Sequence, residues 1–123
     1  MYNFTRFEGQ GPTKDNRISI NRSSEITFPS AFCYENKVFS YTYTVLFWDA
    51  VSKAVGIRFT NKKDEKGIYT LKRSSKGGGA RISVKGFLRA SNIDPALHAG
   101  RYNWKKYEDD VLGSMYVIEL EDK

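Results

Sequence analysis

The sequence is most informative at residues 41–48, Tyr-Thr-Tyr-Thr-Val-Leu-Phe-Trp, where β-branched and aromatic side chains follow one another closely. Residues of these types fill the half-buried surface of a pleated sheet. After a short connection at 49–53, residues 54–60 read Ala-Val-Gly-Ile-Arg-Phe-Thr. The two segments therefore predict a β-hairpin in which Val55, Ile57 and Phe59 share one face.

Shorter segments on both sides of this hairpin also carry the alternation of a strand. We expect these strands at residues 17–20, 26–28, 68–71, 81–84, 101–104 and 114–120. A short helix is expected at 30–36, directly after Pro29, because proline suits the first turn of a helix and cannot continue a central strand. A second short helix is expected at 85–90. The predicted fold class is mainly β with two short helices, arranged as a small β-barrel.

The same order of elements occurs twice along the chain. Residues 17–60 and residues 68–121 each contain a strand, a turn, a short helix and a strand pair, which suggests two similar strand-helix-hairpin halves. If the halves are duplicates, one chain could close the barrel alone. If they are not, the exposed apolar hairpin at 41–60 favours a homodimer. Both a monomer and a homodimer are therefore left open.

Length and composition predict a single domain. With 123 residues, of which 40% are hydrophobic, the chain can close one core. We assign this β-rich domain to residues 17–123 and a flexible N-terminal arm to residues 1–16, which include Gly9, Gly11 and Pro12.

Three observations indicate a cytoplasmic protein. The longest apolar run, residues 45–48, is far shorter than the roughly 20 residues that a bilayer requires, so we expect no membrane association. The N-terminus does not have the pattern of a secretory signal. Cys33 is the single cysteine, so no disulfide can form within the chain. We therefore expect the protein in the cytoplasm.

Residues 17–60 resemble the AbrB/MazE family of swapped-hairpin DNA-binding domains, whose fold is a cradle-loop barrel. The likeness lies in Ile26-Thr27-Phe28-Pro29, in the apolar start of the helix at 31–32 and in the hairpin at 43–59. Family members usually have a basic residue directly after the proline and a Gly-Asp pair before the next strand. This chain has Ser30 and, at 36–38, Asn-Lys-Val in those places. The resemblance implies DNA binding and a role in transcription regulation.

The whole chain is also similar to small bacterial proteins of unassigned function. They share an apolar strand, an aspartate turn, a Gly-Ile pair and a later Ser-x-Lys-(Gly/Ser)-Phe-Leu segment, which correspond here to Asp49, residues 56–57 and residues 83–88. This resemblance implies a fold but no activity.

The net charge of +6 is concentrated in the middle of the chain. Residues 61–90 contain nine lysines and arginines against two acidic residues, whereas the chain from 108 onward is mostly acidic. Basic side chains neutralise phosphates and release counterions, so we predict a DNA-binding regulator or accessory protein. The nucleic-acid contacts are assigned to Lys62, Lys63, Lys72, Arg73, Lys76, Arg81, Lys85 and Arg89.

Two other interpretations of this region are kept. Tyr69, Arg73 and Arg81 interleave aromatic and guanidinium groups, as binding of a single strand by stacking would require. The positive charge could also serve only to keep a small protein soluble.

The residues that usually carry catalysis are scarce. His98 and Cys33 are the single histidine and the single cysteine, so they cannot form a Cys/His metal site, and a serine triad would have one candidate base. We predict a core position for Cys33 and a surface or half-packed position for His98. Gly77-Gly78-Gly79 is expected at a hairpin tip, with phosphate contact through backbone amides as the alternative. We predict no enzyme, with no catalytic residues, metal or cofactor.

Two further functions belong to other classes. A protein-interaction module could use Tyr41, Tyr43, Trp48 or Trp104 as aromatic anchors. A metal-dependent nuclease could use Asp49, Glu119 and Glu121 with Lys123, since such sites gather acids on neighbouring strands. A hairpin turn is the simpler role for Asp49.

Overall fold

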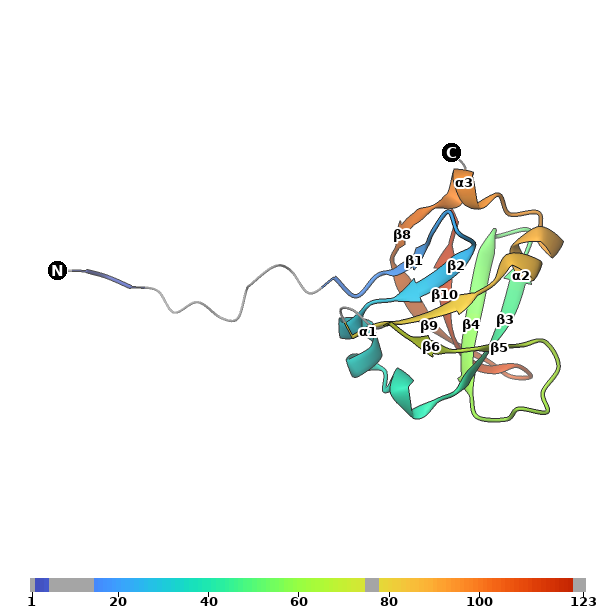
Figure 1. Cartoon of the computed structure of the whole chain (residues 1–123), viewed down its shortest axis with the longest axis horizontal. Helices are drawn as coiled ribbons and strands as arrows, with labels where there is room; N and C mark the ends of the chain where they lie inside the picture. The colour runs from blue at the N-terminus through green and yellow to red at the C-terminus, as the bar shows by residue number, and fades with distance from the viewer. Residues whose placement is uncertain (1, 5–14, 75–77, 121–123) are drawn as a thin grey trace.

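The computed structural model describes residues 2–4, 15–74 and 78–120. In these ranges the chain has ten strands in two five-stranded sheets and three short α-helices (Figure 1). Sheet A has the order β6 (Lys72–Arg73), β7 (Ala80–Ser83), β2 (Glu25–Phe28), β1 (Ile18–Ile20), β8 (Gly100–Tyr102). Sheet B has the order β5 (Ile68–Thr70), β3 (Tyr43–Asp49), β4 (Ala54–Thr60), β10 (Gly113–Glu119), β9 (Trp104–Asp109). The prediction of a mainly β fold is confirmed.

The predicted central hairpin is present as β3 and β4. The two strands pair antiparallel along their whole length, from Tyr43 opposite Thr60 to Asp49 opposite Ala54. On its outer sides, β3 pairs with β5 and β4 pairs with β10. Both edges of the hairpin are thus paired within the chain, so the hairpin does not present an open apolar edge to a second copy.

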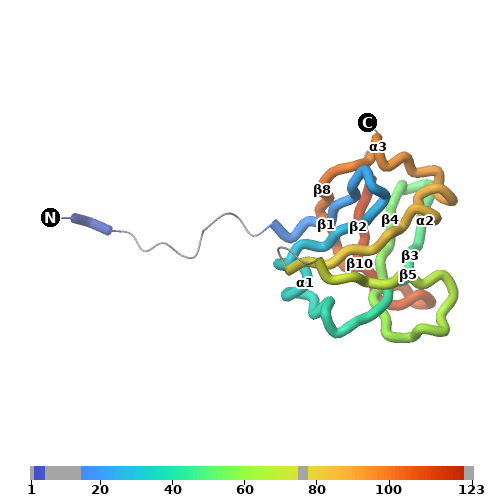
Figure 2. Tube along the Cα trace, viewed as in Figure 1, coloured from blue at the N-terminus to red at the C-terminus, as the bar shows by residue number. Residues whose placement is uncertain are grey.

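The prediction of a small β-barrel is corrected, because the strands form two sheets that are not closed into a barrel. The chain passes from sheet B to sheet A at Leu71, between β5 and β6, and from sheet A to sheet B at Asn103, between β8 and β9. The strand bends at these corners, and its ladder partners change from one sheet to the other. The chain therefore links the two layers at Leu71 and Asn103, although no described strand of one sheet is paired with a strand of the other. Figure 2 shows the course of the chain through both sheets.

The strand-helix-hairpin order recurs in both halves of the chain. In sheet A, β2 of the first half pairs antiparallel with β7 of the second, with Ile26 opposite Ile82. In sheet B, β4 pairs antiparallel with β10, with Ile57 opposite Tyr116. Because β2 leads into α1 and β7 leads into α2, the two helices lie at opposite ends of the β2–β7 pair (Figure 1). This arrangement has the order that a two-fold axis between the halves would produce.

The two predicted helices are α1 (Ser30–Glu35), which buries Phe32 and Cys33, and α2 (Lys85–Ala90), which buries Leu88. A third helix, α3 (Pro95–His98), lies in a segment for which we predicted neither a helix nor a strand. The Asp94 carboxylate accepts a hydrogen bond from the Ala96 amide at 2.9 Å, and Pro95 is the first helical residue. Both features are typical of a helix N-terminus. A short 3-10 helix, η1 (Val38–Ser40), precedes β3.

Phe32 lies at the centre of the core. Its ring contacts Phe28 of β2 at 5.4 Å between centroids, and it meets Trp104 of β9 and Tyr116 of β10 edge-on at 5.1 Å each. Isoleucines of both sheets, such as Ile26, are fully buried around this aromatic cluster. The side chain of Phe32 therefore connects the two sheets.

Two boundaries differ from those expected. The last hairpin is longer, because β9 continues to Asp109, whereas we expected the strand to end at residue 104. The ordered domain already includes part of the predicted arm: the Trp104 indole donates to the Asn16 carbonyl at 2.9 Å, and Asn16 donates to the Glu35 carboxylate at 3.1 Å. Residues 5–14 of the arm lie outside the described residues. Within the described ranges, every helix is too short to span a bilayer.

Candidate nucleic-acid interface

A row of polar side chains crosses the outer face of sheet A. Its members are opposite one another on neighbouring strands, in the order Lys72, Arg81, Thr27, Ser19, Arg101. Residues that are directly opposite in an antiparallel ladder project to the same side of the sheet. The alternate residues of these strands, among them Ile18, Ile26 and Ile82, are buried, so the row faces outward. We call this row, together with Arg17, the sheet A face.

The sheet A face combines positive charge with hydroxyl groups. Neighbouring strands lie about 4.8 Å apart, so a row over five strands is about 19 Å long. Of its five side chains, three are cationic and two carry a hydroxyl group. Arg81 is partly neutralised by Glu25, whose carboxylate lies 3.3 Å from the Arg81 Nε atom.

Asp15 holds the two arginines at the other end of the face. Its carboxylate accepts hydrogen bonds from the backbone amide, Nε and Nη2 of Arg17 at 3.0 Å each. It also accepts one from Nη1 of Arg101 at 2.9 Å. The hydrogen bonds from Arg17 hold the pKa of the Asp15 carboxyl well below its usual range, and the charge of Arg101 adds to the shift.

A hollow of about 340 Å³ opens beside these groups. Its wall includes Asp15, Arg17 and Arg101 and four residues that carry a hydroxyl group, namely Ser19, Thr27, Ser30 and Ser74. Guanidinium and hydroxyl groups both commonly donate hydrogen bonds to phosphate oxygens. The hollow therefore has the chemistry of an anion site.

Only two of the eight predicted contact residues lie on this face, namely Lys72 and Arg81. Arg73 belongs to the opposite side of β6, where its guanidinium lies 3.9 Å from the centre of the Phe39 ring. Tyr69 is half-buried against the core. The predicted stack of Tyr69, Arg73 and Arg81 is therefore not assembled, because alternate residues of a strand project to opposite sides.

The remaining predicted contacts lie elsewhere. Lys62 and Lys63 are exposed in the loop between β4 and β5, at the lower right of Figure 1. Lys85 and Arg89 are exposed on α2, at the upper right, and their four-residue spacing places them on one side of the helix. Lys76 lies outside the described residues.

Sequence reasoning missed Arg17 and Arg101. The alternation of residues 17–20 does place Arg17 and Ser19 on the polar side of a strand. Arg101 comes to the same face because β8 pairs with β1, with Arg101 opposite Ser19. No local pattern contains that pairing, since 82 positions separate the two strand partners.

Sheet B carries a different outer surface. A hollow of about 550 Å³ lies over its strands and is lined by the apolar side chains of Phe47, Tyr107, Leu112, Met115 and Val117, which we call the sheet B face. A β-carbon added to Gly56 would lie 2.5 Å from the Met115 sulfur, so the thioether covers the glycine closely. Acidic residues line the same hollow, namely Asp49, Asp109 and Glu119.

The predicted aromatic anchors lie mostly inside the molecule. Trp48 and Trp104 pack against the core, and Tyr43 is half-buried. Tyr41 is exposed, although its ring lies 6.0 Å from that of Phe59. Exposed apolar side chains lie together instead on the sheet B face, which the sequence prediction did not name.

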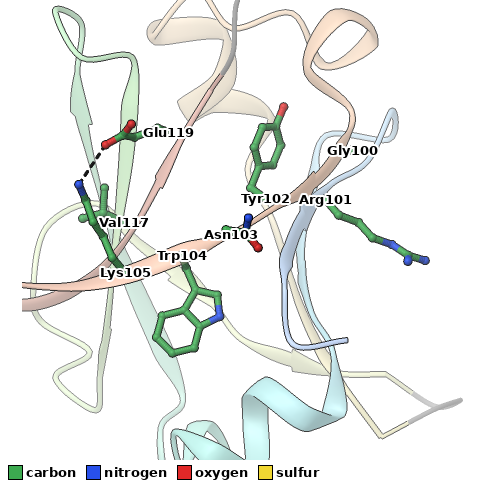
Figure 3. Close-up of a pocket in the computed structure, with 8 residues that line it drawn as sticks. All are labelled: Gly100, Arg101, Tyr102, Asn103, Trp104, Lys105, Val117 and Glu119. Atoms are coloured by element: carbon green, nitrogen blue, oxygen red, sulfur yellow. Dashed lines mark hydrogen bonds and ion pairs between the residues drawn. The ribbon is translucent and has the colours of Figure 1, made fainter. Parts of the chain in front are cut away.

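A third hollow, of about 410 Å³, lies at the corner where β8 becomes β9. Figure 3 shows its residues: Trp104 and Arg101 point in different directions from this corner, and Lys105 pairs with Glu119. The Lys105 amine lies 3.1 Å from the Glu119 carboxylate.

The acids of the nuclease alternative are engaged in local structure. Asp49 accepts hydrogen bonds from the amides of Val51 and Ser52, at 3.0 and 3.2 Å, which confirms its expected role in the hairpin turn. Glu119 pairs with Lys105. The ranges described contain no group of three side chains able to hold a metal ion, and Glu121 and Lys123 lie outside them.

The remaining candidates have structural positions. Cys33 is fully buried, as predicted, and burial raises the pKa of its thiol to about 11. His98 is half-buried in α3, and its carbonyl accepts a hydrogen bond from the Tyr102 hydroxyl. Gly78 adopts a positive φ of 70° in the turn before β7, while a β-carbon on Gly79 would lie 2.4 Å from the Phe28 carbonyl oxygen. Gly77 lies outside the described residues.

Comparisons with protein-family models, with curated proteins and with solved structures gave no significant match. The function of the chain is therefore inferred from its own residues and geometry.

Proposed function

We propose that the protein binds the phosphate backbone of nucleic acid, most simply duplex DNA, through the sheet A face. The observation that carries the proposal is the row of Lys72, Arg81, Thr27, Ser19 and Arg101 across five paired strands. Its length of about 19 Å corresponds to between five and six base pairs at a rise of about 3.4 Å.

The composition of the face favours the backbone over the bases. The five side chains of the row offer charge and hydroxyl groups but no aromatic ring on which an unpaired base could stack. Contacts to phosphates position a protein on DNA without specifying sequence. The proposal is therefore backbone binding that depends strongly on salt. The resemblance of residues 17–60 to AbrB/MazE domains supports DNA as the partner. From the same resemblance we also propose a role in transcription regulation.

The salt dependence of binding tests the proposal. Each neutralised phosphate contributes about −0.9 to the slope of log affinity against log salt, so the four cations of the face predict a slope of about −3.6. This corresponds to a loss of about 150-fold between 50 and 200 mM salt. The measurement is fluorescence anisotropy with a short labelled duplex.

Paired variants locate the surface. Lys72→Gln with Arg81→Gln removes two charges from the face, so we expect the slope to fall to about −1.8. Lys62→Gln with Lys63→Gln removes the same charge from the loop after β4 and should leave the slope near that of the wild type. The absence of binding at 50 mM salt, or an equal effect of both pairs, would refute the assignment.

A second candidate function is self-association through the sheet B face. The hollow of about 550 Å³ over Gly56 favours it, because Tyr107 and Leu112 expose apolar surface beside it and exposed apolar side chains that lie together often mark an interface. Sedimentation equilibrium over a wide range of protein concentration tests this candidate. Tyr107→Glu should lower the association constant at least tenfold, and a wild-type protein that stays monomeric at every concentration removes the candidate.

A further inference from the structure

The partly exposed Asp15 carboxylate accepts hydrogen bonds from two arginine side chains at once. Two guanidinium groups and one backbone amide supply four hydrogen bonds to its two oxygens. The side chains of Arg17 and Arg101 remain 42% and 64% exposed, and that of Asp15 is 28% exposed. The donors thus converge on one point at the edge of the hollow, where a molecule from solution can reach them.

The same donors fit a phosphate group. A guanidinium binds a carboxylate and a phosphate through the same N–H groups. A phosphate can therefore take the place of the Asp15 carboxylate between Arg17 and Arg101. The hydroxyl groups of Ser19, Thr27, Ser30 and Ser74 line the adjoining hollow, and none has a hydrogen-bond partner in the part of the chain that the structure describes. They remain available to the other oxygens of a phosphate.

We propose that Arg17 and Arg101 form a phosphate-binding position of the sheet A face and that Asp15 occupies this position in the free protein. This inference rests on the proposed function and adds to it a competing group within the chain. Nucleic acid then binds by displacing the Asp15 carboxylate, so the observed affinity is lower than the arginines alone would give.

The test compares two variants with the same change in net charge. Asp15→Asn removes the competitor, whereas Asp110→Asn removes an exposed carboxylate from the turn between β9 and β10 of sheet B. We expect Asp15→Asn to bind a short fluorescein-labelled duplex about three- to tenfold more tightly than Asp110→Asn at 50 mM salt, since exposed ion pairs contribute at this level. Arg101→Gln in the Asp15→Asn background should remove most of the gain.

The outcomes separate the inference from the proposed function. Thermal unfolding first establishes that each variant is folded, and the Nε–H signal of Arg17 in NMR spectra should shift when DNA is added to the wild type. Equal affinities of Asp15→Asn and Asp110→Asn would overturn the inference while wild-type binding upholds the proposed function. If the wild type and all variants fail to bind DNA at 50 mM salt, the proposed function is overturned, and the inference with it.

Discussion

Replacing Phe32 with alanine tests whether one side chain joins the two sheets. The ring is fully buried and packs against Phe28, Phe59, Trp104 and Tyr116, with centroid distances between 5.1 and 6.2 Å. Truncating a buried phenylalanine to alanine costs about 3–5 kcal/mol. Aromatic pairs of this geometry add about 0.5–1.5 kcal/mol to the area term, so we expect a loss in the upper part of this range.

Urea unfolding at 25 °C, followed by tryptophan fluorescence and circular dichroism, measures the free energy of unfolding. The matched control is Tyr34→Ala, because Tyr34 lies on the same helix, is exposed and packs against the Phe39 ring with 5.7 Å between the ring centroids. We expect this control to lose about 1 kcal/mol or less. A loss below about 1.5 kcal/mol for Phe32→Ala, or equal losses for both variants, would show that the core does not depend on this ring.

Three further outcomes are expected. Gly79→Ala should destabilise the protein by about 1–3 kcal/mol in urea unfolding, because the added β-carbon would lie 2.4 Å from the Phe28 carbonyl oxygen. Gly86→Ala is the control: open space surrounds this position, so the substitution should stabilise α2 by about 0.5–1 kcal/mol. Cys33 should react with a thiol reagent at pH 8 only after the protein is unfolded, since burial raises its pKa to about 11; rapid labelling of the native protein would contradict this expectation. Backbone amides lower the pKa values of Asp49 and Asp109 below the ordinary 3.8, so their contribution to stability is present above that pH and is lost as pH falls through the lowered values. The midpoint temperature of thermal unfolding should therefore fall as the pH is lowered below about 3.8. This fall should be less steep in the double variant that combines Asp49→Asn with Asp109→Asn.

The sequence correctly predicted those elements in which the residue types and the spacing of apolar residues indicate the same secondary structure. The strand at 54–60 was predicted with its observed bounds, and Pro29 correctly indicated the start of α1. The helix α3 was missed although Asp94 and Pro95 form a recognisable N-terminal signal. The short strand β6 was missed because its two residues are both basic and show no alternation.

The arrangement of the sheets and the candidate site depend on contacts between distant residues. The corners at Leu71 and Asn103, which divide the strands between two sheets, are not visible in the period of the sequence. The hydrogen bond from Arg101 to Asp15 joins residues that are 86 positions apart. A charge window along the chain therefore could not show which cations share a face, since neighbouring residues of a strand project to opposite sides.

The edge strands of the two sheets have a consequence for self-aggregation. A free strand edge is a template on which another chain can polymerise. Of the four edge strands, β5, β6 and β8 have two or three residues each, so they provide little to pair with. The longer edge, β9, carries Lys105, Lys106, Glu108 and Asp109 among its six residues, and docking a second strand there would desolvate these charges. Concentrated solutions of the folded protein should therefore resist fibril growth, and apolar substitutions along β9 are where that resistance would first be lost.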